Sequence, residues 1–102
     1  MAMKKYYFLL YLRGEKSDSF TPGELEKIQS GHVAHIERML DEGVACMAGP
    51  FDDDTEKRGL IIFDLDQEDE VRGWADQDPG VQSGRLSYEI HPWWGLQGSV
   101  LK

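Results

Sequence analysis

The apolar residues of this chain gather in four short segments that are separated by polar stretches. Residues 6–12, 44–51 and 58–65 are nearly continuous apolar and aromatic runs, whereas residues 85–94 alternate between polar and apolar side chains. Continuous runs are typical of well-packed strands, and alternation is typical of a strand with one buried face. The pattern therefore predicts four β-strands.

The stretch between the first two predicted strands carries the signals of a long helix. Thr21 is a suitable N-cap, Pro22 suits the first helical position, and Glu24 completes a capping box. Gly43 is placed to end the helix in the left-handed conformation. The sequence predicts a helix that runs from Pro22 to Glu42.

A second, shorter helix is predicted over residues 67–78. Asp66 is a suitable N-cap, acidic residues fill the first turn where the helix dipole favours them, and Pro79 prevents continuation. The order of the predicted elements is β-α-β-β-α-β. This order is the split βαβ arrangement, and it predicts an α+β fold with a four-stranded antiparallel sheet and both helices on one face.

The size and the charge of the chain limit its partners. A length of 102 residues predicts one domain. The net charge of −8 disfavours binding to a phosphate backbone, and the lysine and arginine residues form only isolated pairs such as Lys4-Lys5 and Lys57-Arg58. We therefore expect no nucleic-acid partner.

The N-terminal segment and the only cysteine bear on location. Two lysines precede the apolar run at 6–12, as in a secretory signal, but the run holds three tyrosines and no small-residue cleavage site follows. A first strand is the better interpretation. No apolar segment approaches the roughly 20 residues that span a bilayer. Cys46 excludes an internal disulfide and fits a reducing cytoplasm, and its apolar neighbours predict that it is buried.

Two histidines, His32 and His35, lie three residues apart in the first predicted helix. On a helical wheel His32 falls within the apolar stripe and His35 on its flank, so we expect His32 to be buried and His35 more exposed. The stripe consists of Leu25, Ile28, Ile36, Met39 and Leu40. His32 is then either a core residue with hydrogen-bond partners or a catalytic base. A metal site is disfavoured, because no third ligand lies at a recognisable spacing.

Several motifs in their order are similar to those of the YCII-related family of small proteins. They are "HVAHIERMLDEGVACMAGPF", "GLIIFDL" and "WADQDPGVQSGRLSYEIHPW". The resemblance extends over residues 6–94 and leaves 95–102 as a peripheral tail. It implies a ferredoxin-like fold that forms a dimeric α+β barrel, and hence a homodimer. It also implies a pocket between the sheet and the helices that contains a catalytic histidine and aspartate.

The resemblance assigns both members of this pair to positions in the sequence. His32 lies nine residues before Asp41 of the "DEG" motif, and Asp78 is the aspartate of the "DP" dipeptide. Asp78 could also simply end a helix before a proline. Relatives often have an aromatic residue after this dipeptide, where this chain has Gly80, and we expect the glycine to widen the pocket mouth or to loosen the loop.

Two functions of different classes are compatible with such a pair. A carboxylate that orients a histidine suits proton transfer on a small organic acid or phenol, as in a lyase, an isomerase or a dehydrochlorinase. The alternative is a noncatalytic module that binds a small ligand or forms a dimer. No nucleotide-binding or other cofactor motif is present, so we expect neither a cofactor nor a metal.

The adjacent tryptophans Trp93 and Trp94 follow the predicted last strand. Side chains alternate along an extended chain, so the two cannot both face one side. We expect one to pack on its own subunit near the pocket rim and the other to lie in a dimer contact. Leu96, Val100 and Leu101 are expected to extend that contact over the partner.

Overall fold

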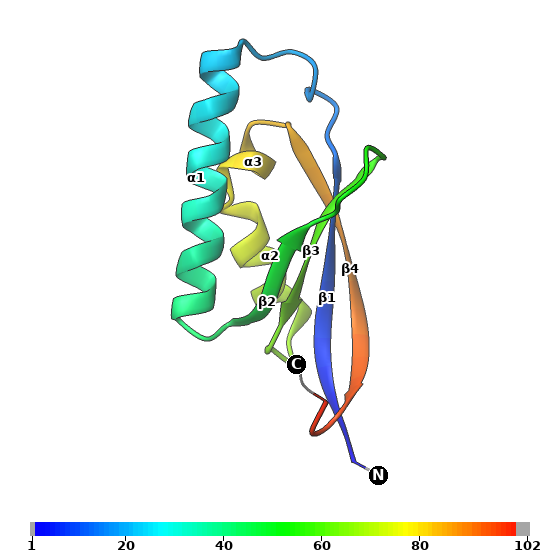
Figure 1. The fold of residues 1–102 in the computed structure, drawn as a ribbon. Helices are drawn as coiled ribbons and strands as arrows, with labels where there is room; N and C mark the ends of the chain where they lie inside the picture. The colour runs from blue at the N-terminus through cyan, green and yellow to red at the C-terminus, as the bar shows by residue number, and fades with distance from the viewer. Residues whose placement is uncertain (1, 100–102) are drawn as a thin grey trace.

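The computed structural model describes residues 2–99, which form a twisted sheet with helices on one face (Figure 1). The chain passes in order through β1 (Met3–Arg13), α1 (Pro22–Asp41), β2 (Ala45–Pro50), β3 (Lys57–Phe63), α2 (Glu68–Asp76), α3 (Pro79–Gln82) and β4 (Leu86–Leu96). The predicted four strands and two main helices are confirmed, and α3 is an additional short helix.

The four strands pair in the order β2-β3-β1-β4, and every neighbouring pair is antiparallel. This order is that of the split βαβ arrangement, and the helices cover the same face, so the predicted α+β ferredoxin-like fold is confirmed. β1 and β4 are the longest strands and continue past the helices at the lower end of the molecule (Figure 1).

The first helix begins and ends where the local signals predict. The Thr21 side chain accepts a hydrogen bond from the Glu24 backbone N–H, and the Glu24 side chain accepts one from the Thr21 backbone N–H. Gly43 follows the helix with a φ of 77°, a conformation that glycine adopts without steric cost.

The second helix differs from its prediction at both ends. Gln67, not Asp66, is its N-cap, and no side chain caps it. Pro79 was predicted to prevent continuation of the helix, and α2 does end before it. Pro79 also occupies the first turn of a further helix, α3. A proline suits that position since its missing N–H is not needed there. The residue before it, Asp78, becomes the N-cap of α3.

The core lies between the sheet and the helices. Alternate residues of β1 point into it, and so do alternate residues of β3. Its buried apolar members are Tyr7, Leu9, Tyr11, Met39, Ala45, Ile61, Phe63, Val71 and Ala75. Burial of each large side chain among them contributes about 1.5–3 kcal/mol.

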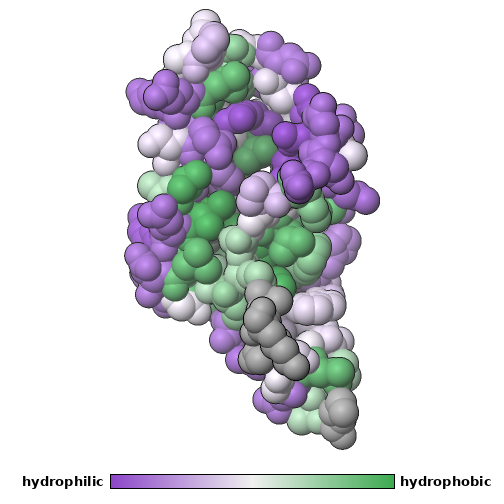
Figure 2. All heavy atoms as spheres, viewed as in Figure 1, coloured by the Kyte–Doolittle hydropathy of each residue, from purple (hydrophilic) through white to green (hydrophobic). Residues whose placement is uncertain are grey.

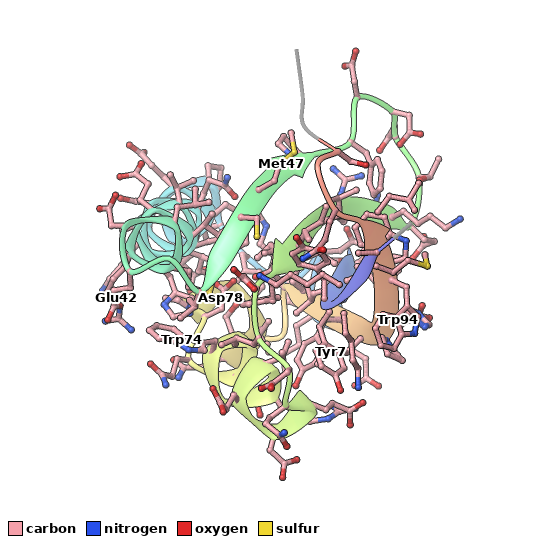
Figure 3. The ribbon with its side chains drawn as sticks, turned by 90° about the horizontal axis from the view of Figure 1, so that it is seen from below. Tyr7, Glu42, Met47, Trp74, Asp78 and Trp94 are labelled. Carbon is pink, nitrogen blue, oxygen red and sulfur yellow. The ribbon has the colours of Figure 1, made fainter. Side chains whose placement is uncertain are left out.

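The opposite face of the sheet has no helix over it in the described part of the chain. Phe8, Leu10 and Ile62 occupy the alternate positions of β1 and β3 and are only partly buried. Met47 of β2 also points away from the helices and is 41% exposed (Figure 3). This face therefore presents apolar side chains that residues 2–99 leave without a covering layer.

Both tryptophans lie within β4, as the strand predicted over residues 85–94 implies. The separate expectation that they follow the last strand is wrong, because β4 continues to Leu96. They do point to opposite faces, as alternation requires. Trp93 packs on the helix-free face, with its ring centroid 6.1 Å from that of Tyr6 and 6.4 Å from that of Phe8. Trp94 lies on the other face, near the end of the strand (Figure 3). Val100 and Leu101, which were expected to extend a dimer contact over the partner, lie outside the described residues.

Cys46 is exposed, so the prediction of a buried cysteine is wrong. It lies on β2, which is an edge strand, at a point where the pairing with β3 shifts register between Ala45 and Met47. Such a shift interrupts the alternation that places every second residue in the core. Within residues 2–99, no helix is long and apolar enough to cross a membrane.

Candidate functional site

Asp78 is a fully buried carboxylate at the junction of α2 and α3. The Tyr11 hydroxyl donates a hydrogen bond of 2.7 Å to its Oδ2 atom, and the Gly80 backbone N–H donates one of 2.8 Å to Oδ1. His32 Nδ1 also lies 2.7 Å from Oδ2. The predicted contact between His32 and Asp78 is therefore present, and Tyr11 is a third member that the sequence analysis did not include.

Three elements bring these side chains together, namely β1 with Tyr11, α1 with His32 and the start of α3 with Asp78. Gly31, which precedes His32, lets α3 approach α1 closely, because a Cβ there would lie 3.0 Å from the Pro79 side chain. The Tyr11 ring packs edge-on to the imidazole of His32, with centroids 5.1 Å apart and planes at 80°. Asp78 thus lies between α1 and the strands (Figure 3).

The hydrogen bonds determine the charge of each group. Burial raises the pKa of Asp78, but the hydrogen bonds from His32, Tyr11 and Gly80 outweigh it and hold the pKa below its ordinary value. Burial also raises the pKa of Tyr11 well above its ordinary value, and the neighbouring Asp78 charge adds to this. At neutral pH Asp78 is therefore a carboxylate and Tyr11 a neutral hydroxyl.

The ionised Asp78 determines which nitrogen of the His32 ring carries a proton when the ring holds a single one. A carboxylate only accepts hydrogen bonds, so Nδ1 of the ring must carry the proton and donate it. The other ring nitrogen, Nε2, then has a free lone pair. Among the described residues, the side-chain hydrogen bonding of His32 involves Nδ1 only. The arrangement therefore provides an oriented nitrogen that can accept a proton.

His35 is buried, with 7% of its surface exposed, so the prediction that it is more exposed than His32 is wrong. Its Nε2 atom lies 2.7 Å from the carbonyl oxygen of Trp74, and the two rings pack at 5.9 Å. The helical wheel did not include the packing of α2 and α3 beside α1, which buries the flank that carries His35. His35 thus holds α1 against α2, a structural role.

His32 is only partly buried because it lines a cleft of about 560 Å³ between α1 and the sheet. This volume is within the range of small-molecule sites. The recess opens on the face seen in Figure 2, where hydrophilic residues gather beside it. Its apolar walls are formed by Leu25, Val33, Ile36, Ala48, Pro50, Leu60 and Leu86. Neither tryptophan of β4 lines it, so the expected place of one of them at the pocket rim is wrong.

Gly80 does not line the cleft, so the expectation that it widens the mouth is wrong. It is buried behind the His32–Asp78 pair. A Cβ at this position would lie 2.9 Å from Leu86 Cδ1, 3.1 Å from Asp78 Oδ1 and 3.3 Å from His32 Nδ1. The glycine therefore provides the space that the pair occupies.

Within residues 2–99, no group of three or more histidine, cysteine or acidic side chains is arranged to hold a metal ion. Other polar side chains do line the cleft. They are Arg13, Ser17, Gln29, Glu37, Arg58 and Arg85. The sequence analysis did not single out any of these, because they come from separate segments and share no motif.

A family model described as the YCII-related domain matches residues 6–94 of the chain. This chain belongs to the YCII-related domain family. No curated protein sequence matches it at a significant level. Among solved structures, the YCII-related domain is similar to the 5-chloro-2-hydroxyhydroquinone dehydrochlorinase of Burkholderia phenoliruptrix in complex with 2,5-dihydroxybenzoquinone. The TM-score is 0.54 at 21% identity, over 85% of this chain and 92% of the other. At this identity the likeness supports a shared fold.

Proposed function

We propose that this protein is an enzyme that transfers protons on a small organic molecule, of the organic acid or phenol kind, with His32 as the general base. The observation that carries the proposal is the ionised, buried Asp78, which orients His32 at the wall of a cleft of ligand size. A structural histidine would not need a cleft beside it. His35, which is buried against a backbone carbonyl, is an example in the same helix.

The chemical step follows from the geometry. His32 Nε2 takes a proton from a C–H or O–H group of the substrate, and the electron pair stays on the substrate as an enolate or phenolate. The imidazolium that forms is stabilised by the Asp78 carboxylate at Nδ1. Return of the proton to another atom completes an isomerisation. Departure of an anionic leaving group completes an elimination, as in a lyase or a dehydrochlorinase.

The test is proton exchange in D2O, followed by NMR, on a panel of keto acids, ketones and chlorinated hydroquinones, with chloride release measured for the last group. The sharpest variant is His32→Asn, because the asparagine side chain can still donate to Asp78 from the position of Nδ1 but has no Nε2. We expect exchange or chloride release to fall about 100-fold to 10,000-fold in this variant.

The matched control is His35→Gln, which keeps a donor near the Trp74 carbonyl and leaves the cleft unchanged. It should retain the activity of the wild-type protein. If His32→Asn is as active as the wild type, the proposed function is wrong. Binding of panel members without any exchange or release would instead support the alternative of a noncatalytic ligand-binding module.

We also propose that the protein is a homodimer in which two sheets pack face to face. The support is the helix-free face, where Phe8, Leu10, Ile62 and Met47 lie with Trp93. Apolar patches of this kind on a sheet commonly mark interfaces. Sedimentation should therefore give twice the chain mass of 11.6 kDa at micromolar concentration. A monomer under these conditions would rule out the dimer.

A further inference from the structure

Three arginines line the cleft in a protein whose net charge is −8. They are Arg13, Arg58 and Arg85, and the acidic side chain among the lining residues is that of Glu37. The cleft is therefore richer in positive charge than the protein as a whole. A local excess of this sign attracts anions and holds them where the surrounding walls reduce screening by water.

Arg85 is held beside α1, the helix that carries His32, by a neutral partner. Its Nη1 atom donates a hydrogen bond of 3.0 Å to the side-chain oxygen of Gln29, which precedes His32 by one turn of α1. Within residues 2–99, no carboxylate lies within ion-pair distance of Arg85. Its charge at the cleft wall is thus not neutralised by the described part of the chain.

Arg13 is paired only loosely. Its guanidinium nitrogens lie 3.6–3.9 Å from carboxylate oxygens of Asp18, Asp54 and Glu56, whose side chains are 92%, 93% and 78% exposed. Charge-assisted hydrogen bonds are about 2.7–2.9 Å long, so these contacts are weak ion pairs. The Nε atom of Arg13 is buried and makes no hydrogen bond within residues 2–99, because the Glu56 carboxylate oxygen beside it is 3.6 Å away. A donor of this kind is costly unless a ligand satisfies it.

The backbone brings Arg13 and Arg85 to the same end of the sheet. β1 pairs with β4 so that Arg13 lies opposite Leu86, the residue after Arg85. The N–H of Gly14 donates to the Arg85 carbonyl at 2.8 Å. A Cβ at Gly14 would lie 2.2 Å from the Gly84 carbonyl oxygen, so this close approach requires glycine. Arg13 is the last residue of β1 and Arg85 directly precedes β4, so the pairing of these strands sets the positions of both backbones.

We propose that the cleft binds its substrate as a carboxylate, which Arg85 and Arg13 hold while the apolar walls cover the rest of the molecule. A guanidinium matches a carboxylate because its planar fork donates two parallel hydrogen bonds. The bound molecule then extends from the arginines along the cleft toward His32. The proposal deepens the proposed function, and rests on it for the role of His32, by selecting carboxylic acids among the possible substrates.

The experiment compares the binding of benzoate with that of benzamide, a neutral molecule of nearly the same shape, by NMR titration. Benzoate should bind about tenfold or more tightly than benzamide. Arg85→Gln and Arg13→Gln should each weaken benzoate binding about tenfold and leave benzamide binding unchanged. Arg85→Lys keeps the charge but loses the fork, so its effect on benzoate should be intermediate.

The matched control is Arg72→Gln, which removes the same charge from an exposed helix position outside the cleft. It should leave benzoate binding unchanged, which separates a local site from an effect of net charge. Equal binding of benzoate and benzamide by the wild type, or unchanged benzoate binding by Arg85→Gln, would overturn the proposal. So would an equal loss in Arg72→Gln.

Failure of this inference is distinguishable from failure of the proposed function. Benzoate binding does not require His32 to act as a base, so His32→Asn should still discriminate between benzoate and benzamide. If proton exchange depends on His32 but benzoate is not preferred, the proposed enzymatic function stands and the proposed carboxylate site is wrong. If benzoate is preferred and exchange is absent, the proposed carboxylate site stands and the proposed role of His32 as a general base is wrong.

Discussion

Tyr11 and Asp78 are 67 positions apart in the sequence and are joined by a buried hydrogen bond of 2.7 Å from the phenol to the carboxylate. The bond ties the central strand to the N-cap of α3. It also takes one of the acceptor sites of the Asp78 oxygen that His32 contacts. The Asp78 carboxylate, which orients His32, is therefore stabilised by a hydrogen bond from the sheet as well as by contacts from the helices.

Replacement of Tyr11 by phenylalanine removes this donor without changing the ring. Hydrogen bonds to charged groups contribute about 1.5–3 kcal/mol, and we expect a loss of that order in the free energy of unfolding, measured by urea denaturation. The control is Tyr88→Phe, which removes an exposed hydrogen bond to Asp76 and should cost less. Equal effects of the two substitutions would show that the Tyr11 hydroxyl has no special role.

The low pKa of Asp78 makes a pH-dependent contribution to stability. Because the folded state lowers this pKa below the ordinary value of 3.8, the carboxylate stabilises the fold above about pH 3.8. That contribution is lost as the pH falls through the lower, folded-state value. Asp78→Asn should be less stable than the wild type at about pH 6, and the difference should narrow toward about pH 2. Urea denaturation across this range measures it, and a constant difference would contradict it.

Replacement of Gly80 by alanine should disturb the site through packing alone. The new Cβ would press on Leu86, Asp78 and His32, and we expect a cost of about 1–3 kcal/mol in stability together with reduced exchange activity. Gly73→Ala is the control, because a Cβ there meets nothing within 4 Å and alanine favours a helix. It should be neutral or stabilising. A Gly80 variant with the same stability and activity as the Gly73 variant would contradict this prediction.

Introduction of a charge at Leu10 tests the proposed dimer. Leu10 lies in the middle of β1 on the helix-free face, where a glutamate would be buried by a partner. Leu10→Glu should therefore sediment as a monomer at concentrations where the wild type is a dimer. Leu40→Glu, at an exposed position of α1, should leave the oligomeric state unchanged. If the Leu10→Glu variant were still a dimer, the interface would not lie on the helix-free face.

Local sequence signals determined the elements and their order. The capping box at Thr21 and the glycine at Gly43 placed the ends of α1, because caps are interactions between residues that are neighbours along the chain. Strand periodicity likewise placed β1, β3 and β4, and the order of the elements led to the fold. The helical wheel singled out His32, and the resemblance to a family selected the same residue independently. Asp78 was found only through that resemblance, since no periodicity relates it to His32.

Only the tertiary structure decided which side chains surround that pair. In the sequence, Tyr11 is indistinguishable from the other aromatic residues of its strand. Only the fold places its hydroxyl against Asp78. His35 proved more buried than His32 because α2 and α3 cover one flank of α1, while a cleft stays open on the other. Arg13 and Arg85 are far apart in sequence, and strand pairing brings them to the same end of the sheet. A helical wheel or a strand pattern describes one element at a time, whereas burial, charge and cleft shape depend on what the other elements place beside it.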